Sequence, residues 1–153
     1  NLGAAYLATG RWDDAIKVFE KLVGNIMYGT PGHGHNNLGW AWYKKGNLAK
    51  ARQHFSMAIN LAPQLCPAYN NLALVLIREQ RNERAMKYLK RALKRCPTYA
   101  EPYYHMGRVE VRRRNFEEAK KNFAKCVKLA GDTPLTERCQ ERLRGDPSTG
   151  VSN

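Results

Sequence analysis

Three sets of residues recur along this chain at the same intervals, and this repetition constrains the fold more than any other feature. One set consists of small residues, a second of alanines and a third of large apolar residues. In each set successive members lie 36, 34 and 34 residues apart. The sets are Gly3, Gly39, Ala73 and Gly107; Ala15, Ala51, Ala85 and Ala119; and Phe19, Phe55, Leu89 and Phe123. A shared period of this length predicts stacked structural repeats, each of which buries its apolar face against its neighbours.

The residue types at these positions resemble the tetratricopeptide repeat, which has Leu-Gly in a first helix, Ala and Phe in a second, and Pro at the end. Leu38-Gly39 and Met106-Gly107 supply the first pair, and Pro63 and Pro97 end their units. Glycine allows two antiparallel helices to approach closely, phenylalanine fills the space between adjacent hairpins, and proline ends the second helix. We therefore expect an all-α tetratricopeptide-repeat superhelix of antiparallel helix pairs with a C-terminal capping helix.

The pattern also predicts the order of the elements. The expected helices cover residues 1–9 and 12–23, 32–45 and 48–61, 66–79 and 82–95, 100–113 and 116–130, and 134–144. The expected organisation is a partial repeat with a loop at 1–29, repeats at 30–65, 66–99 and 100–131, a capping helix at 132–144 and a disordered tail at 145–153. The first interval is two residues longer than the others, so we expect a longer, looser loop within residues 24–34. Because Leu2 and Gly3 already fit the helical pattern, we expect the natural protein to extend upstream.

The composition is strongly basic and contains no sign of catalysis. Lys and Arg number 26 against 13 Asp and Glu, a net charge of +13, which favours anionic partners without choosing among them. There is no Gly-rich phosphate loop, nucleophile elbow or distinct carboxylate pair, so we expect neither enzymatic activity nor a cofactor. No run of 18 apolar residues occurs.

His33 and His35 form a His-x-His pair beside the Gly-rich segment. Alternate residues at the start of a helix point away from each other, and no third ligand lies nearby in the sequence. We therefore interpret the pair as part of a polar loop rather than as a metal site.

The four cysteines fall at the ends of predicted helices. Cys66 begins the first helix of its repeat and Cys96 ends the second, while Cys126 and Cys139 lie at neighbouring ends of the last two helices. Antiparallel hairpins bring such ends together, which favours disulfides between Cys66 and Cys96 and between Cys126 and Cys139. Each bond would stabilise the chain by roughly 2–4 kcal/mol and would indicate an oxidising compartment. The alternative is four reduced, half-buried thiols in a cytosolic protein.

The first helix of each repeat lines the concave groove of this fold, so side chains there that packing does not use are candidates for binding a partner. Trp42 occupies the inward position of its helix, which leaves Trp40 about 200° away on the groove wall. The candidates are Asn36, Trp40, Tyr43, Lys44, Asn70, Leu74, Ile77, Arg78, Tyr104, Arg108 and Arg112. Aromatic and aliphatic groups flanked by cations predict binding of an apolar peptide that carries acidic residues. The alternative for Trp40 is that another segment of the chain covers it.

Two basic runs occur, at residues 87–95 and 112–114. In the first, apolar residues alternate with cations at helical spacing, which favours a solvated outer face over contact with nucleic acid.

The segment from Tyr28 to Pro31, followed by the run from Asn36 to Gly46 (NNLGWAWYKKG), resembles the tetratricopeptide pilotins of type IV pilus secretins. Cys-Pro-x-Tyr at residues 66–69 and again at 96–99 is also similar to members of this group. The resemblance implies a lipoprotein at the periplasmic face of the bacterial outer membrane, with an N-terminal lipid anchor and further repeats outside this chain. It implies as partner a secretin subunit, whose localisation and multimerisation the protein promotes.

Two other hypotheses remain open at this point. One is a cytosolic tetratricopeptide adaptor or co-chaperone that binds an acidic peptide. The other is an RNA-binding helical repeat protein, which only the net charge of +13 suggests. An upstream signal peptide with a lipid-modified cysteine would favour a pilotin over both of these.

Overall fold

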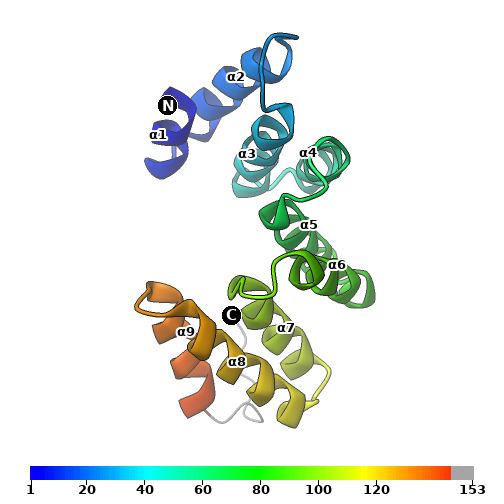
Figure 1. Cartoon of the computed structure of the whole chain (residues 1–153), viewed down its shortest axis with the longest axis vertical. Coiled ribbons are helices and arrows are strands. Elements are labelled where there is room, and N and C mark those ends of the chain that lie inside the picture. Colours follow the sequence, from blue (N-terminus) through cyan, green and yellow to red (C-terminus); the bar gives the residue numbers. More distant parts are fainter. Residues whose placement is uncertain (146–153) are drawn as a thin grey trace. The chain divides into compact units, whose positions relative to one another are not determined.

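The computed structural model describes residues 1–145, which form nine α-helices and no strand (Figure 1). Each observed helix begins and ends within one residue of its predicted bounds, so the all-α prediction is confirmed. The helices are α1 (Leu2–Ala8), α2 (Trp12–Val23), α3 (Pro31–Lys44), α4 (Leu48–Leu61), α5 (Cys66–Arg78), α6 (Asn82–Arg95), α7 (Glu101–Arg112), α8 (Phe116–Ala130) and α9 (Pro134–Arg144). The predicted disordered tail lies outside the described residues, apart from Gly145. The chain divides into two compact units, Asn1–Glu79 and Gln80–Asn153.

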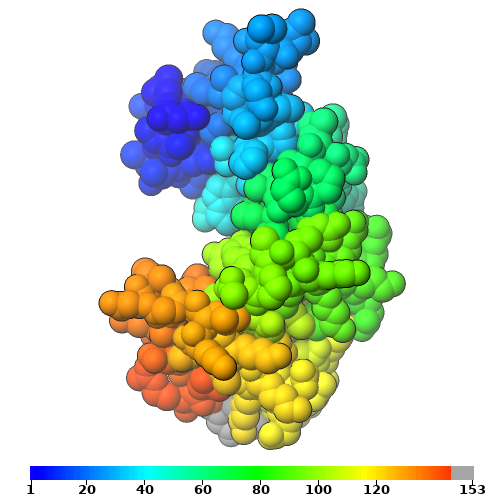
Figure 2. All heavy atoms as spheres, viewed as in Figure 1, coloured from blue at the N-terminus to red at the C-terminus, as the bar shows by residue number. Residues whose placement is uncertain are grey.

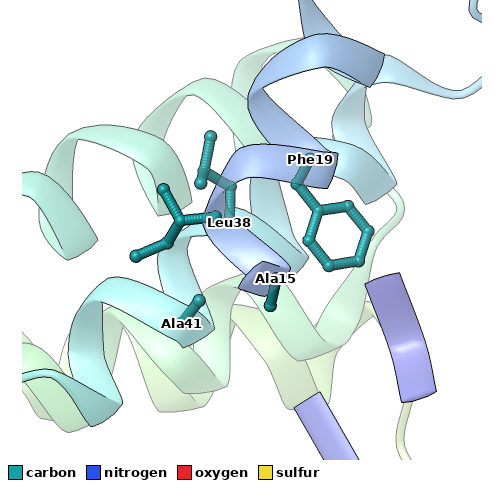
Figure 3. Close-up of a cluster of buried hydrophobic side chains, with 5 residues drawn as sticks. Ala15, Phe19, Leu38 and Ala41 are labelled. Atoms are coloured by element: carbon teal, nitrogen blue, oxygen red, sulfur yellow. The ribbon is translucent and has the colours of Figure 1, made fainter. Parts of the chain in front are cut away.

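In the first unit, α1 packs on α2, α2 on α3, α3 on α4 and α4 on α5. One buried cluster joins the second helix of one pair to the first helix of the next: Ala15 and Phe19 of α2 lie beside Leu38 and Ala41 of α3 (Figure 3). All four side chains are fully buried. Ala15 and Phe19 are members of the repeating sets, and Leu38 and Ala41 lie within two residues of the repeating Gly39, so the periodicity of the sequence is the periodicity of the core.

Three glycines of the repeating set lie directly under a phenylalanine ring. A Cβ atom placed on Gly3, Gly39 or Gly107 would lie 2.6–2.8 Å from the nearest ring carbon of Phe19, Phe55 or Phe123 respectively. Such distances are well inside van der Waals contact, so any side chain there would push the ring away. The glycines therefore permit the close helix approach that the sequence pattern predicted.

A further periodic feature becomes visible in the backbone. The second residue after the end of each first helix has a positive φ: 72° at Gly10, 85° at Gly46, 59° at Gln80 and 61° at Arg114. These four positions lie at the same intervals as the core residues. Glycine adopts this conformation without strain, whereas Gln80 and Arg114 adopt it at a steric cost.

The connection between α2 and α3 spans residues 24–30 and is longer than those between α4 and α5 (62–65) or α6 and α7 (96–100), as predicted. The segment that follows it, however, is not a loop. Pro31 begins α3, and Gly32 and Gly34 are buried in its first turns, where added Cβ atoms would lie 2.6 Å from the Ala62 side chain and 2.8 Å from the Val23 side chain respectively. Gly32 and Gly34, which suggested a loose segment, instead allow the start of α3 to pack closely against its neighbours.

In the second unit, α6 packs on α7, α7 on α8 and α8 on α9. Its core cluster contains Tyr104, Ala119, Phe123, Cys126 and Cys139, and Leu135 and Leu143 of α9 pack against it. The capping helix thus covers apolar side chains of the last repeat, as expected of a terminal element. Among the described residues, none of the helices is long and apolar enough to cross a bilayer.

Candidate protein-binding surface

The two tryptophans of α3 face different environments. Trp42 packs against the core cluster of the first unit, as the sequence predicted. Trp40 is half-buried, and its indole stacks on the phenol ring of Tyr43 with the ring centroids 5.4 Å apart and the planes 21° from parallel. This stacking fixes both rings, so a ligand that contacts them would lose little side-chain entropy of the protein.

Cations of the same unit surround these rings. The Lys44 ammonium lies 5.6 Å from the ring centroid of Trp40 and 5.6 Å from that of Trp12. The Arg78 guanidinium lies 5.0 Å from the Tyr43 ring, and its Nη1 donates a hydrogen bond of 3.3 Å to the Tyr43 carbonyl oxygen. We call these five residues, Trp12, Trp40, Tyr43, Lys44 and Arg78, the aromatic–cation cluster.

The aromatic–cation cluster suits a particular chemistry. Its rings offer partly exposed apolar faces, while Lys44 and Arg78 are exposed and keep donors available for carboxylates. Aromatic and arginine side chains are the residue types that most often dominate binding energy at protein interfaces. The cluster can therefore hold a peptide that carries both an apolar and an acidic side chain.

Asn36, another predicted site residue, lies on α3 one turn before Trp40. Its Oδ1 accepts a hydrogen bond of 3.0 Å from the side-chain amide of Asn71, which joins α3 to α5. The half-buried Asn36 thus stabilises the packing of these helices as well as lying beside the cluster.

Three predicted groove residues of α5 are not accessible. Asn70, Leu74 and Ile77 are only 1%, 9% and 4% exposed, so the prediction that packing leaves them free is wrong. The reason is that α5 is apolar around most of its circumference, with ten of its thirteen residues buried, as expected of a helix enclosed by protein. The run of five apolar residues at 73–77 carried this signal.

The predicted site residues of the second unit also differ from expectation. Tyr104 is 8% exposed because its ring lies against Phe123, with centroids 6.0 Å apart, and beneath the Arg138 guanidinium of α9 at 5.1 Å. The capping helix therefore helps to cover this residue. Arg108 is half-buried and Arg112 is exposed, so these two remain accessible cations on α7.

The interpretation of the histidines needs correction as well. His33 and His35 lie within α3 rather than in a loop, and His33 is exposed. His35 stacks on His54 of α4, and their Nδ1 atoms form a hydrogen bond of 3.0 Å. Burial, together with the neighbouring His35 and Lys50, lowers the pKa of His54 to about 4, so His54 is neutral at physiological pH. Burial also lowers the pKa of His35. No group of three potential metal ligands occurs among the described residues.

The cysteines are oxidised, which confirms the prediction. Cys126 of α8 and Cys139 of α9 form a disulfide, with Cα atoms 6.2 Å apart. Cys66 and Cys96 are disulfide-bonded too, and no cysteine is free. The disulfide between Cys126 and Cys139 fastens the capping helix to the last repeat.

Sequence reasoning missed two features of the first unit. Trp12 belongs to the aromatic–cation cluster although it begins a second helix, and the sequence signal was a large aromatic residue directly after a helix turn. Ile26 and Met27, in the long connection, are 98% and 84% exposed, which is unusual for large apolar side chains.

Comparisons with known proteins agree with this architecture. Three family models described as tetratricopeptide repeat match residues 1–65, 67–109 and 100–133. The chain belongs to the tetratricopeptide-repeat proteins. Tetratricopeptide repeats act as protein-interaction scaffolds, and the partly exposed aromatic–cation cluster is consistent with that role.

Solved structures of similar fold include structures of MamA and of YrrB. A crystal structure of MamA has a TM-score of 0.71 at 17% sequence identity, and the match covers 94% of this chain and 91% of that chain. YrrB, described as a tetratricopeptide protein with an unusual peptide-binding site, has a TM-score of 0.72 at 20% identity over 91% and 71% of the two chains. MamA 41-end from Desulfovibrio magneticus RS-1 has a TM-score of 0.71 at 21% identity over 86% and 74%. No curated protein sequence matches the chain significantly.

Proposed function

We propose that this tetratricopeptide-repeat protein is a pilotin-type scaffold that binds a secretin subunit of the type IV pilus machine. The observation that carries the binding role is the aromatic–cation cluster, in which stacked Trp40 and Tyr43 rings are flanked by Lys44 and Arg78. This cluster suits an apolar, acidic segment of a partner protein. That YrrB, of similar fold, is described as having a peptide-binding site supports the same kind of use.

The choice of a secretin as partner rests on the pilotin resemblance and on features consistent with it. A Cβ atom added to Gly34 would lie 2.9 Å from the ring of Tyr28, which belongs to the Tyr-x-x-Pro segment. This segment therefore packs on the start of α3. It thereby helps to position the helix that carries Trp40. In this proposal the protein promotes outer-membrane localisation and multimerisation of the secretin.

The proposed location is the periplasmic face of the bacterial outer membrane, where a lipid anchor outside this chain would hold the protein. The oxidised cysteines support an oxidising compartment, because disulfides persist in the periplasm and are rare in the cytosol. Four free thiols in protein taken from its native compartment would instead favour a cytosolic adaptor.

The test is the affinity of the full-length protein for the secretin subunit, measured by isothermal titration calorimetry. Trp40→Ala removes the central ring of the cluster and is expected to weaken binding at least thirtyfold, the effect of losing about 2 kcal/mol. Lys44→Glu places a repulsive charge in the same cluster and should also weaken binding.

The matched control is Lys128→Glu, which makes the same charge change at an exposed position of α8. It should change the affinity less than threefold. If folded Trp40→Ala and Lys44→Glu proteins bind like the parent, the cluster is not the site. If the parent does not bind the secretin at all, the proposed partner is wrong.

A further inference from the structure

The second unit carries a dense group of cations on α6, a helix that contributes no residue to the aromatic–cation cluster. Its exposed side chains include Arg84, Lys87, Lys90 and Lys94, which we call the α6 basic face. Arg91 and Arg95 are exposed on the same helix. The only acidic residue of α6 is Glu83, and it forms an ion pair with Arg113 of the second unit. Figure 2 shows α6, in green, at the molecular surface.

The cations of α6 occupy one broad side of the helix. At about 100° per residue, the positions from Lys90 round to Arg95 cover an arc of about 140°, and residues 84–94 extend about 15 Å along the axis. The opposite side carries the buried Ala85, Met86, Leu89 and Ala92. The basic face therefore lies on the side of α6 opposite its packed side, and the outer side of a helix is a convex cylinder.

Several of these cations lie three or four residues apart, where like charges on a helix destabilise it by roughly 0.2–0.5 kcal/mol per pair. The other second helix of this unit, α8, offsets part of that cost with acidic residues. In α8, Glu117 and Glu118 lie within 3.7 Å of Lys120 and 3.5 Å of Lys121 respectively. A net charge of +13 is thus not spread evenly, because α6 concentrates cations where α8 mixes signs.

We propose that the α6 basic face binds the surface of a membrane that contains anionic phospholipids. A convex arc of lysines can contact many headgroup phosphates at once on a broad surface, and each cation near such a surface contributes about 1 kcal/mol. The apolar side of α6 is committed to the core, so the helix rests on the headgroups without inserting.

Nucleic acid fits this face less well. Proteins that bind single strands combine a positively charged groove with exposed aromatic rings on which bases stack. The face is convex, and its one aromatic residue, Tyr88, is half-buried with the Arg91 guanidinium 5.1 Å above its ring. The inference does not depend on the secretin proposal, because it rests on residues of another unit.

The test uses the full chain and sedimentation at low salt with vesicles of phosphatidylcholine that contain the anionic lipid phosphatidylglycerol. The variant Lys87→Gln, Lys90→Gln, Lys94→Gln removes three charges with little change in helix propensity. Its partitioning should fall on the order of a hundredfold relative to the parent. Binding of the parent should also decrease at 0.5 M salt, where screening is strong.

The matched control is the triple variant Lys120→Gln, Lys121→Gln, Lys128→Gln, which removes three exposed lysines from α8. Its net charge equals that of the α6 variant. Its partitioning into the anionic vesicles should be lower than that of the parent by no more than about threefold to tenfold. Equal losses in both variants would mean that net charge alone acts, and the proposal would be wrong.

Two further arms complete the design. Vesicles of phosphatidylcholine alone should not bind the chain. Single-stranded and duplex RNA, tested with the same variants, should bind weakly and without distinguishing them. No binding to anionic vesicles, or tight RNA binding that only the α6 variant loses, would overturn the assignment.

Discussion

The contact between Gly107 and Phe123 permits a quantitative test of why the repeat has its residue pattern. An added Cβ on Gly107 would lie 2.6–2.8 Å from three carbons of the Phe123 ring. Gly107→Ala should therefore cost about 1–3 kcal/mol from overpacking, offset by about 1 kcal/mol of improved helix propensity. Phe123→Leu alone leaves space unfilled and should cost roughly 1–1.5 kcal/mol.

The double variant should be less destabilised than the sum of the two, because a leucine leaves room for the new methyl group. The sequence already contains this combination, since the third repeat has Ala73 and Leu89 at the corresponding positions. We expect a favourable coupling free energy of about 1–2 kcal/mol.

The assay is native-state hydrogen exchange of α7 and α8 amides, which reports the local opening free energy within a repeat array. The equivalent double-mutant cycle at Gly39 and Phe55, where an added Cβ would lie 2.8 Å from the nearest ring carbon, provides an internal replicate. Additivity within about 0.5 kcal/mol at both sites would refute the packing explanation.

Three other perturbations have defined outcomes. Arg114→Gly should stabilise the chain by about 1 kcal/mol in urea unfolding, because Arg114 has a φ of 61°; a loss of stability would contradict this. Burial, with Arg108 and Arg138 nearby, lowers the pKa of His105 to about 3. Since the unfolded value is near 6.5, the stability that this group provides is present above pH 6.5 and is lost as the pH falls, by about 3 kcal/mol at pH 4.5. His105→Gln should remove this pH dependence, and an unchanged slope would exclude His105 as its source. Cys139→Ser should lower the free energy of unfolding by about 3 kcal/mol and increase hydrogen exchange in α9 selectively, whereas unchanged protection of α9 would show that the disulfide does not fasten it.

The repeat period predicted the fold because core positions recur in sequence where they recur in space. Gly39 and Phe55 lie sixteen residues apart in the sequence and in contact in the structure, and the same relation holds at Gly3 and Gly107. Local periodicity was enough to place every helix, and it separated Trp40 from Trp42 on α3.

The candidate site could be predicted only in part, because accessibility depends on which elements cover a helix. Helical spacing placed Leu74 and Ile77 toward a groove, yet both are buried on α5. Tyr104 is covered by a capping helix whose existence was predicted but whose contacts were not. His35 and His54 lie on different helices, and nothing in their spacing indicates that the two rings stack.

The central claim is that this scaffold binds acidic, apolar peptide segments through the aromatic–cation cluster. The most direct measurement is selection of a phage-displayed random peptide library on the parent protein, followed by affinity measurement of the selected peptides for the parent and for Trp40→Ala. The account predicts peptides that contain Asp or Glu beside an aromatic or aliphatic residue, and affinities that fall at least thirtyfold in the variant. Selected peptides without acidic residues, or peptides that bind folded Trp40→Ala as tightly as the parent, would contradict it.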